Sequence, residues 1–213
     1  MVVVCEGDKN FSRARNGIVG VVLAGGKSSR MGTEKSFVSL AGAPLIDRVA
    51  RRLQAQVAHA AINANGDSSR FHRLSLTVLA DATINVGPLA GVLAGLRWAN
   101  QHAHATHLLT VPCDGPFFPL NLGARLLDAM LAEGTDIAIA RSRARSHPTF
   151  ALYAISIVND LAGWIAQSND RSVSRWMSHF RTANVDFEGD PDPFTNINTP
   201  DDLATALFTL KAV

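Results

Sequence analysis

Short apolar runs alternate with helical patterns through the first two thirds of the chain. Residues 18–24 form a continuous apolar run, which is typical of a strand covered on both faces. Apolar residues then recur at every fourth position over 45–57, behind Pro44, and predict an amphipathic helix. Further strands are predicted at 59–66, 75–81, 107–112 and 136–140, with helices at 87–100 and 122–130. Such alternation predicts an α/β fold, a mostly parallel sheet covered by helices.

The last third of the chain continues without a linker or an internal repeat. It predicts strands at 147–153 and 183–187, helices at 156–166 and 172–180, and a closing helix at 199–210. Thr199 is the expected cap of that helix, with Pro200 in its first turn. We therefore expect a single domain over 17–213. Residues 1–16 begin with a very short apolar stretch followed by charges, so we expect a flexible extension and no signal peptide.

Composition excludes several classes of function. The 213 residues are 47% hydrophobic, enough for a core, and the net charge of +2 gives no reason to expect a nucleic acid or membrane partner. A single tyrosine and 7% aromatic residues argue against a surface that stacks bases. Cys5 and Cys113 are far apart and indicate neither a disulfide framework nor a zinc site. We expect a cytoplasmic protein.

Residues 21–35, VVLAGGKSSRMGTEK, place a basic glycine-rich loop after the first strand. The spacing is one residue away from the Walker A pattern and also lacks the dinucleotide pattern G-x-G-x-x-G. Gly25 and Gly26 still allow backbone amides to approach phosphate oxygens. Arg30 and Lys35 supply cations that suit such oxygens. The loop therefore predicts a triphosphate site.

Polar or glycine-rich clusters follow five of the predicted strands. They lie at 25–35, 63–66, 81–87, Asp114 and 141–145. Ligands bind beyond the carboxyl ends of the strands in open parallel sheets. We expect these clusters to converge on a nucleotide site at one edge of the sheet.

Asp114 is the candidate metal ligand, because it directly follows the strand at 107–112. Magnesium prefers one or two carboxylates together with substrate phosphates. Aspartate before glycine is also typical of a plain turn. Local chemistry leaves the two roles open.

The local sequence also leaves the roles of other polar residues undecided. Three asparagines are as expected of ordinary turns: Asn63, Asn65 and Asn198. The arginines at 141, 143 and 145 indicate either an anion site or a solvated loop. His147 is as compatible with a structural role as with a catalytic one.

The chain resembles the molybdenum cofactor guanylyltransferases. LAGGKSSRMGTEK is similar to that family's signature L-A-G-G-x-S-x-R-M-G-x-x-K. Further similar blocks follow in the family's order: INAN, GPLAG, VPCDGPFFP, HPTFALY and NINTPDDL. The signature loop alone is shared by a wide superfamily of nucleotidyltransferases, and the later blocks narrow the resemblance. It covers the chain from about residue 17 to the end.

The resemblance implies a fold, a reaction and partners. The fold would be a three-layer α/β/α domain of Rossmann-like kind. The reaction would be transfer of GMP from GTP to molybdopterin-bound molybdenum, with Mg²⁺ as cofactor and pyrophosphate as product. Molybdoenzymes or their chaperones would be further partners.

The resemblance also assigns roles by motif. Leu23, Ala24 and Gly25 match backbone that recognises guanine, and Gly26 belongs to the same nucleotide loop. Arg30 and Lys35 match the triphosphate clamps, and Asp114 matches the ligand of Mg²⁺ and GTP. The remaining matches are Asn63 and Asp81 on the base or ribose side, Asn196 and Asn198 near the active site, and Arg145 toward the pterin.

Two small departures and three alternatives accompany this reading. Glu34 stands where aspartate is usual, and the segment 81–87 is short. A cytidylyltransferase of the same cofactor and a sugar-phosphate nucleotidyltransferase share the loop. A non-catalytic module that binds a nucleotide and delivers cofactor is the alternative from another class.

Overall fold

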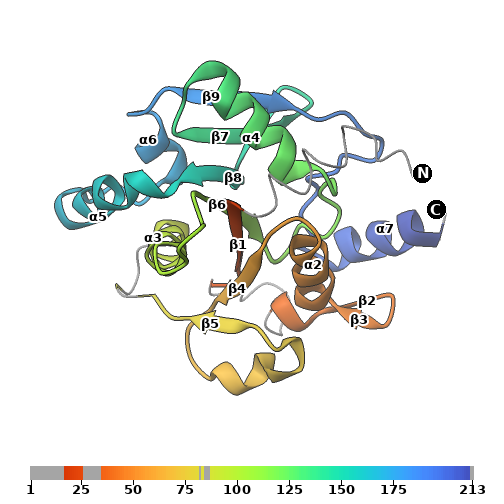
Figure 1. The fold of residues 1–213 in the computed structure, drawn as a ribbon. Coiled ribbons are helices and arrows are strands. Elements are labelled where there is room, and N and C mark those ends of the chain that lie inside the picture. Colours follow the sequence, from red (N-terminus) through yellow and green to blue (C-terminus); the bar gives the residue numbers. More distant parts are fainter. Residues whose placement is uncertain (1–16, 26–34, 82, 84–86, 212–213) are drawn as a thin grey trace, which may run out of the picture.

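The computed structural model describes residues 17–25, 35–81, 83 and 87–211. The predicted extension, residues 1–16, lies outside the described residues, as do Gly26 and Arg30. The described chain builds a sheet of seven strands in the order β5-β4-β1-β6-β8-β7-β9 (Figure 1). The strands are β1 (Ile18–Leu23), β4 (His59–Asn63), β5 (Thr77–Leu79), β6 (His107–Pro112), β7 (Ile137–Ser142), β8 (Arg145–Ala154) and β9 (Thr182–Asp186).

Strand direction confirms the predicted sheet. β1 pairs in parallel with β4 and β6, β4 with β5, and β7 with β9. Only β8, among the described strands of this sheet, is antiparallel to its neighbours β6 and β7. Because β8 is antiparallel to both β6 and β7, β7 runs in the same direction as β6. The carboxyl ends of β1, β4, β5, β6 and β7 therefore share one edge of the sheet.

Helices cover both faces of the sheet, which confirms the three-layer α/β/α fold. Side chains of β1 alternate between the two faces: Ile18 and Val22 join one core cluster, and Val19 and Val21 join the other. The first cluster packs under α2 (Leu45–Gln54) and α4 (Leu122–Glu133). The second packs under α3 (Pro88–Ala99), α5 (Val158–Gln167) and α6 (Val173–Met177).

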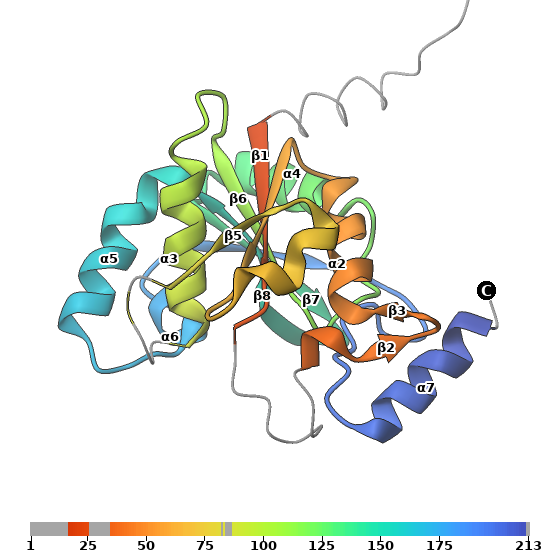
Figure 2. The same cartoon turned by 90° about the horizontal axis from the view of Figure 1, so that it is seen from below.

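A smaller third cluster joins the region of residues 40–45 to the C-terminal part of the described chain. It brings Leu40 and Leu45 against Ile197 and Ala206. Both views show α7 (Pro200–Lys211) beside the hairpin of β2 (Ser39–Leu40) and β3 (Ala43–Pro44) (Figure 2). The remaining elements are the short 3-10 helices η1 (Lys35–Phe37), η2 (Ser68–Leu74) and η3 (Ile155–Ile157).

The predicted cap of the closing helix is confirmed. Thr199 Oγ1 accepts a hydrogen bond from the Asp202 backbone N–H at 3.1 Å. The Thr199 N–H donates in return to Asp202 Oδ2 at 2.9 Å. This reciprocal pair satisfies two backbone donors at the start of α7. Among the described helices, none has both the length and the apolar content needed to cross a bilayer.

Several predicted boundaries were wrong. The strand expected at 75–81 begins only at Thr77, because Ser75 ends η2 in a left-handed conformation with φ 50°. The strand expected at 59–66 ends at Asn63. The helix expected at 172–180 spans five residues, Val173–Met177.

The basic segment 141–145 is not the loop that the sequence suggested. Arg141 lies in β7 and Arg145 begins β8, so only two residues connect the strands. Those residues, Arg143 and Ala144, both have positive φ, at 47° and 61°. This is the backbone of a tight hairpin turn whose twist matches that of the strands.

Gly20 tests how closely α2 packs on the sheet. A Cβ at this position would lie 2.8 to 3.0 Å from three side-chain atoms of Leu53. Gly20→Ala should therefore destabilise the protein by about 1–3 kcal/mol through overpacking, measured by urea unfolding. Gly163→Ala is the control, because nothing lies within 4 Å of its Cβ position in α5. That variant should gain roughly 0.5–1 kcal/mol. Equal stabilities of the two variants would contradict the packing.

Candidate functional site

The carboxyl ends of the central strands are tied to one another by backbone hydrogen bonds. The Ala24 N–H donates to the Asn63 carbonyl at 2.9 Å, which joins the ends of β1 and β4. The Cys113 N–H donates to the Leu23 carbonyl at 3.1 Å, which joins β6 to β1. The structure thus brings the predicted segments after β1, β4 and β6 together at one edge of the sheet. Gly25 lies exposed at that edge.

Lys35 is the centre of the side-chain contacts at this edge. Its Nζ donates to Asp114 Oδ2 at 2.5 Å and also to Asn198 Oδ1. The side chains of Lys35 and Asp114 are only 16% and 15% exposed, so the ion pair is largely shielded from water. The Ile197 N–H donates to the Asp114 carbonyl at 2.8 Å. Three segments far apart in sequence therefore meet around one cation.

The second carboxylate oxygen of Asp114 has an unusual environment. Asp114 Oδ1 is buried and has no hydrogen-bond partner among the described residues. A buried acceptor without a donor costs free energy and calls for an explanation. A hard cation would supply one, because Mg²⁺ prefers carboxylate oxygen. The described part of the chain holds no group of three or more His, Cys, Asp or Glu that could bind a metal. Magnesium is usually held by one or two carboxylates together with substrate phosphates and water.

Asn63 and Asp81 form a second polar group at the same edge. Asn63 Nδ2 donates to Asp81 Oδ1 at 2.8 Å and to the Leu79 carbonyl at 3.1 Å. Asn65 adds two bonds to Asp81: its Nδ2 donates to Oδ2 at 2.7 Å, and its Oδ1 accepts from the Asp81 N–H at 2.9 Å. Asn63 is buried. The two asparagines thus fix the direction of the Asp81 carboxylate.

The structure explains why the second glycine of the GPLAG block, Gly91, has no side chain. A Cβ on Gly91 would lie 2.2 Å from Asn63 Oδ1 and 2.9 Å from Leu23 Cδ2. The first turns of α3 therefore approach the ends of β1 and β4 too closely for any side chain. The block positions Asn63 by leaving room for it.

The other predicted residues lie on the far side of Asp114 from Asn63. Asn196 is exposed, with Oδ1 3.2 Å from the Cβ position of Gly115, so it lies next to the Asp114 turn. Arg145 is exposed at the start of β8. The nearby arginines pair outward: Arg141 with Asp186 at 3.6 Å and Arg143 with Asp190 at 2.9 Å. Gly26 and Arg30 lie outside the described residues.

A cluster that the sequence did not reveal supports the C-terminal end of the loop. Asp47 is buried and accepts three hydrogen bonds from Arg73, at 2.7 to 3.0 Å. The guanidinium groups of Arg70 and Arg73 lie 4.3 and 5.5 Å from the centre of the Phe37 ring, within range of a cation–π interaction. Phe37 ends the helix η1 that Lys35 begins. The cluster therefore helps to fix the backbone that carries Lys35.

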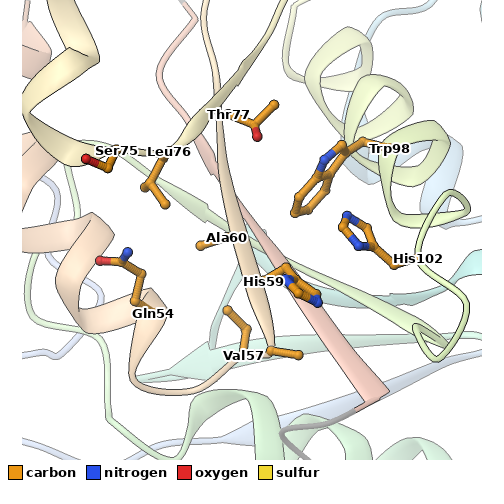
Figure 3. A pocket seen from close by; sticks show the side chains of 10 residues that line it. Gln54, Val57, His59, Ala60, Ser75, Leu76, Thr77, Trp98 and His102 are labelled. Carbon is orange, nitrogen blue, oxygen red and sulfur yellow. The ribbon is translucent and has the colours of Figure 1, made fainter.

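A pocket of about 390 Å³ lies at the opposite edge of the sheet (Figure 3). It is lined at the amino ends of β4 and β5 and the last turns of α2 and α3, by residues that include Gln54, His59, Ser75 and Trp98. None of the predicted site residues lines it. Its described lining holds no lysine, arginine, aspartate or glutamate, so it lacks the charges that a triphosphate site needs.

Comparison with known proteins assigns the chain to a family. The family of the MobA-like NTP transferase domain matches residues 20–183. The molybdenum cofactor guanylyltransferase of Rhizobium rhizogenes is 45% identical over 203 residues, which cover 90% of this chain and 92% of that protein. The protein of the same name from Sinorhizobium fredii is 45% identical over 194 residues, with coverages of 87% and 88%.

Solved structures share the fold. Molybdopterin-guanine dinucleotide biosynthesis protein A from Archaeoglobus fulgidus superposes with a TM-score of 0.74 and 26% identity, covering 92% of this chain and all of that one. A 4-diphosphocytidyl-2C-methyl-D-erythritol synthase from Anaerococcus prevotii reaches a TM-score of 0.72 at 12% identity, over 93% and 99% of the chains. The fold alone therefore does not select the nucleotide.

The thiol next to Asp114 offers a test of how well this edge is shielded. Burial, and to a lesser extent the Asp114 charge, raises the pKa of Cys113 to about 11. At about pH 8 its thiolate fraction should be roughly a hundredfold lower than that of an ordinary thiol. In a Cys5→Ser chain, where Cys113 is the one cysteine left, alkylation by iodoacetamide should be very slow until guanidinium unfolds the protein. Rapid alkylation of the folded chain would show that the edge is open.

Proposed function

Because the chain belongs to the MobA-like NTP transferase family, we propose that it transfers GMP from GTP to a molybdopterin-type cofactor and releases pyrophosphate. The relatives with 45% identity over about nine tenths of both chains carry the name molybdenum cofactor guanylyltransferase. One observation carries the proposal at the level of chemistry. A shielded cation, Lys35, pairs with a carboxylate whose other oxygen is buried without a hydrogen-bond partner among the described residues, at the edge of the sheet where nucleotides bind.

Three sets of residues take the guanosine, the triphosphate and the pterin acceptor. The backbone of Leu23, Ala24 and Gly25 and the Asn63–Asp81 pair take the guanosine side, because Leu23 and Asn63 both lie against Gly91 in α3 and Asn63 holds Asp81. Gly26 joins this side by its place in the family motif. Arg30 and Lys35 take the triphosphate. Arg145, at the start of β8, takes the pterin cofactor. Asn198 contacts Lys35, and Asn196 lies next to the turn that carries Asp114.

The reaction needs charge neutralisation more than proton transfer. A terminal phosphate of the acceptor is already a nucleophile at neutral pH, so no general base is required. Its oxygen forms a bond to the α-phosphorus of GTP while the bond to the β-phosphate oxygen breaks, and the electron pair leaves with pyrophosphate. Lys35 lies where it can stabilise the charge that develops on these oxygens. Asn198 keeps the ammonium group of Lys35 in place through its own hydrogen bond.

Asp114 is the residue that would hold Mg²⁺. Its buried Oδ1 has the chemistry of a hard-cation ligand. When bound, the ion would neutralise phosphate oxygens of GTP and of the leaving pyrophosphate. The turn at Asp114 is fixed for this purpose by the Ile197 N–H, which donates to its carbonyl.

The site also extends beyond the matched family region. Asn198 contacts Lys35, although the family match ends at residue 183. We therefore propose that residues 17–213 act as one nucleotidyltransferase domain, with the segment before α7 as part of the site.

The alternatives have less support. A cytidylyltransferase or a sugar-phosphate nucleotidyltransferase would share the fold, but the relatives of highest identity reported above are guanylyltransferases by name. A module that only binds nucleotide would not need a buried carboxylate at Asp114, one oxygen of which has no donor in the described part of the chain, because such an oxygen destabilises the fold and repels the triphosphate.

Nucleotide selectivity tests the reaction. The protein should release pyrophosphate when incubated with GTP, Mg²⁺ and molybdopterin, and much less with CTP or ATP. A preference for CTP would place it with the cytidylyltransferases. Nucleotide binding without turnover for any triphosphate would favour the binding module.

Asp114→Asn tests the metal role. The amide keeps the size and the turn preference of aspartate but is a poor ligand for a hard cation. Turnover should fall by roughly 10²- to 10³-fold and recover in part at high Mg²⁺, while the melting temperature changes little. Asp128→Asn, at an exposed position in α4, is the matched control and should leave turnover unchanged. Ordinary turnover of folded Asp114→Asn at ordinary Mg²⁺ would exclude Asp114 as the ligand.

A further inference from the structure

A buried hydroxyl joins two ionisable side chains beside the acceptor side of the site. Ser142, the last residue of β7, is 2% exposed. Its Oγ lies 2.7 Å from His147 Nε2 and 2.8 and 2.9 Å from the two carboxylate oxygens of Asp192. Asp192 comes from the connection between β9 and α7, fifty positions further along the chain. None of these contacts enters the function proposed above.

The number of protons fixes the direction of these bonds. A serine hydroxyl has one hydrogen, and an ionised carboxylate only accepts. Ser142 must therefore donate to Asp192, and its oxygen is left to accept from His147. His147 then carries its hydrogen on Nε2. Burial lowers the pKa of His147 more than the Asp192 charge raises it, so the ring is neutral above its ordinary pKa and adopts the Nε2–H tautomer.

The segment that begins at Asp192 leads directly to the proposed active site. Asp192 Oδ1 also accepts from the Phe194 N–H at 2.9 Å. The buried Phe194 ring packs 4.9 Å from both the His147 and Phe150 rings, centre to centre. Four residues after Phe194, Asn198 contacts Lys35. One end of the segment is thus fixed at Ser142 and the other at the Lys35–Asp114 pair.

The strands place this anchor at the same edge of the sheet. Ala151 of β8 lies opposite Thr110 of β6, and β6 ends at Pro112. His147, four residues before Ala151, therefore extends past the end of β6 toward the turn that carries Asp114. The two-residue turn after Ser142 brings the start of β8 back beside β7. The hairpin can therefore hold its serine and histidine in one fixed arrangement.

We propose that Ser142, His147 and Asp192 form a positioning network that holds the segment 192–198, so that Asn196 and Asn198 face Lys35 and Asp114 during transfer. The inference rests on the proposed function for its catalytic consequence. The three residues touch no reacting atom in this proposal. They act through Asn198, whose side-chain oxygen Oδ1 accepts a hydrogen bond from the Lys35 ammonium and positions it.

The tautomer of His147 tests the network without any assay of activity. Nitrogen-15 NMR spectra of the full chain at about pH 8 separate the two neutral tautomers, and His147→Gln identifies the signal among the seven histidines. We expect Nε2–H in the unmodified chain. Ser142→Ala removes the acceptor, and the amide of Asp192→Asn donates to Ser142 and frees its hydrogen for His147. Both variants should therefore populate Nδ1–H. Neutral His147 with its hydrogen on Nδ1 in the unmodified chain would overturn the network.

Amide chemical shifts and the rate of GMP transfer test whether the network positions the segment 192–198 for catalysis. Backbone amide signals of Ile197 and Asn198 should shift in Ser142→Ala and Asp192→Asn, and kcat for GMP transfer should fall by roughly 10- to 100-fold. The loss should appear in kcat more than in KM for GTP, because Lys35 acts on charge that grows in the transition state. Asp190→Asn is the matched control, because the Asp190 side chain is 95% exposed and pairs at the surface with Arg143.

Each outcome has a defined meaning. The proposal is supported if Ser142→Ala and Asp192→Asn keep the melting temperature of the unmodified chain but change the His147 tautomer, shift the Ile197 and Asn198 amide signals and lower kcat. The proposal is overturned if the amide signals of Ile197 and Asn198 and the kcat of these two variants equal those of Asp190→Asn, even if the His147 tautomer changes. If the unmodified chain transfers no GMP, the proposed function fails by itself. The shifts of the Ile197 and Asn198 amides then still decide whether the network positions the segment.

Discussion

The ion pair between Lys35 and Asp114 is the contact on which the site depends. Its two charges are about 85% shielded from water by their surroundings, and transfer of charges out of water is costly unless each finds a partner. The pair therefore requires that the loop after β1 and the turn after β6 meet at one point. Parallel pairing of β1 with β6, in register from Ile18 opposite His107 to Leu23 opposite Pro112, produces that meeting.

Close backbone packing around this contact leaves little freedom to rearrange it. Gly91 and Gly115 both lack room for a side chain: their Cβ positions are 2.2 Å from Asn63 Oδ1 and 2.4 Å from Phe150 Cζ. Asn63 is fixed on one side of Asp114, and the Phe150–Phe194 packing on the other. Catalysis by positioning and electrostatics needs groups that are held before the substrate arrives. Here the core of the domain provides this rigidity.

Local patterns in the sequence predicted most of the elements, and non-local contacts account for what was missed. Apolar runs and helical periodicity located the central strands and α2, α3, α4 and α7, and Thr199 was identified as a cap. The left-handed conformation of Ser75 and the two-residue turn at Arg143 are backbone conformations that the periodicity of apolar residues does not predict. Asp47 pairs with Arg73 across 26 positions, and Ser142 with Asp192 across 50. Such pairs appear only once the sheet order is known.

The Lys35–Asp114 pair also indicates how the two charges can change partners. A lysine and a carboxylate in contact cancel each other, so neither is buried alone. The proposed substrates bring the complementary charges: phosphate oxygens for Lys35, and a divalent cation for Asp114. If both arrive together, each residue exchanges one opposite charge for another, and no buried charge is left unpaired at any stage. A triphosphate without a cation would instead compete with Asp114 for Lys35 and leave the carboxylate facing an anion. If the proposed substrates bind in this way, this geometry would couple the binding of nucleotide to the binding of metal through these two side chains.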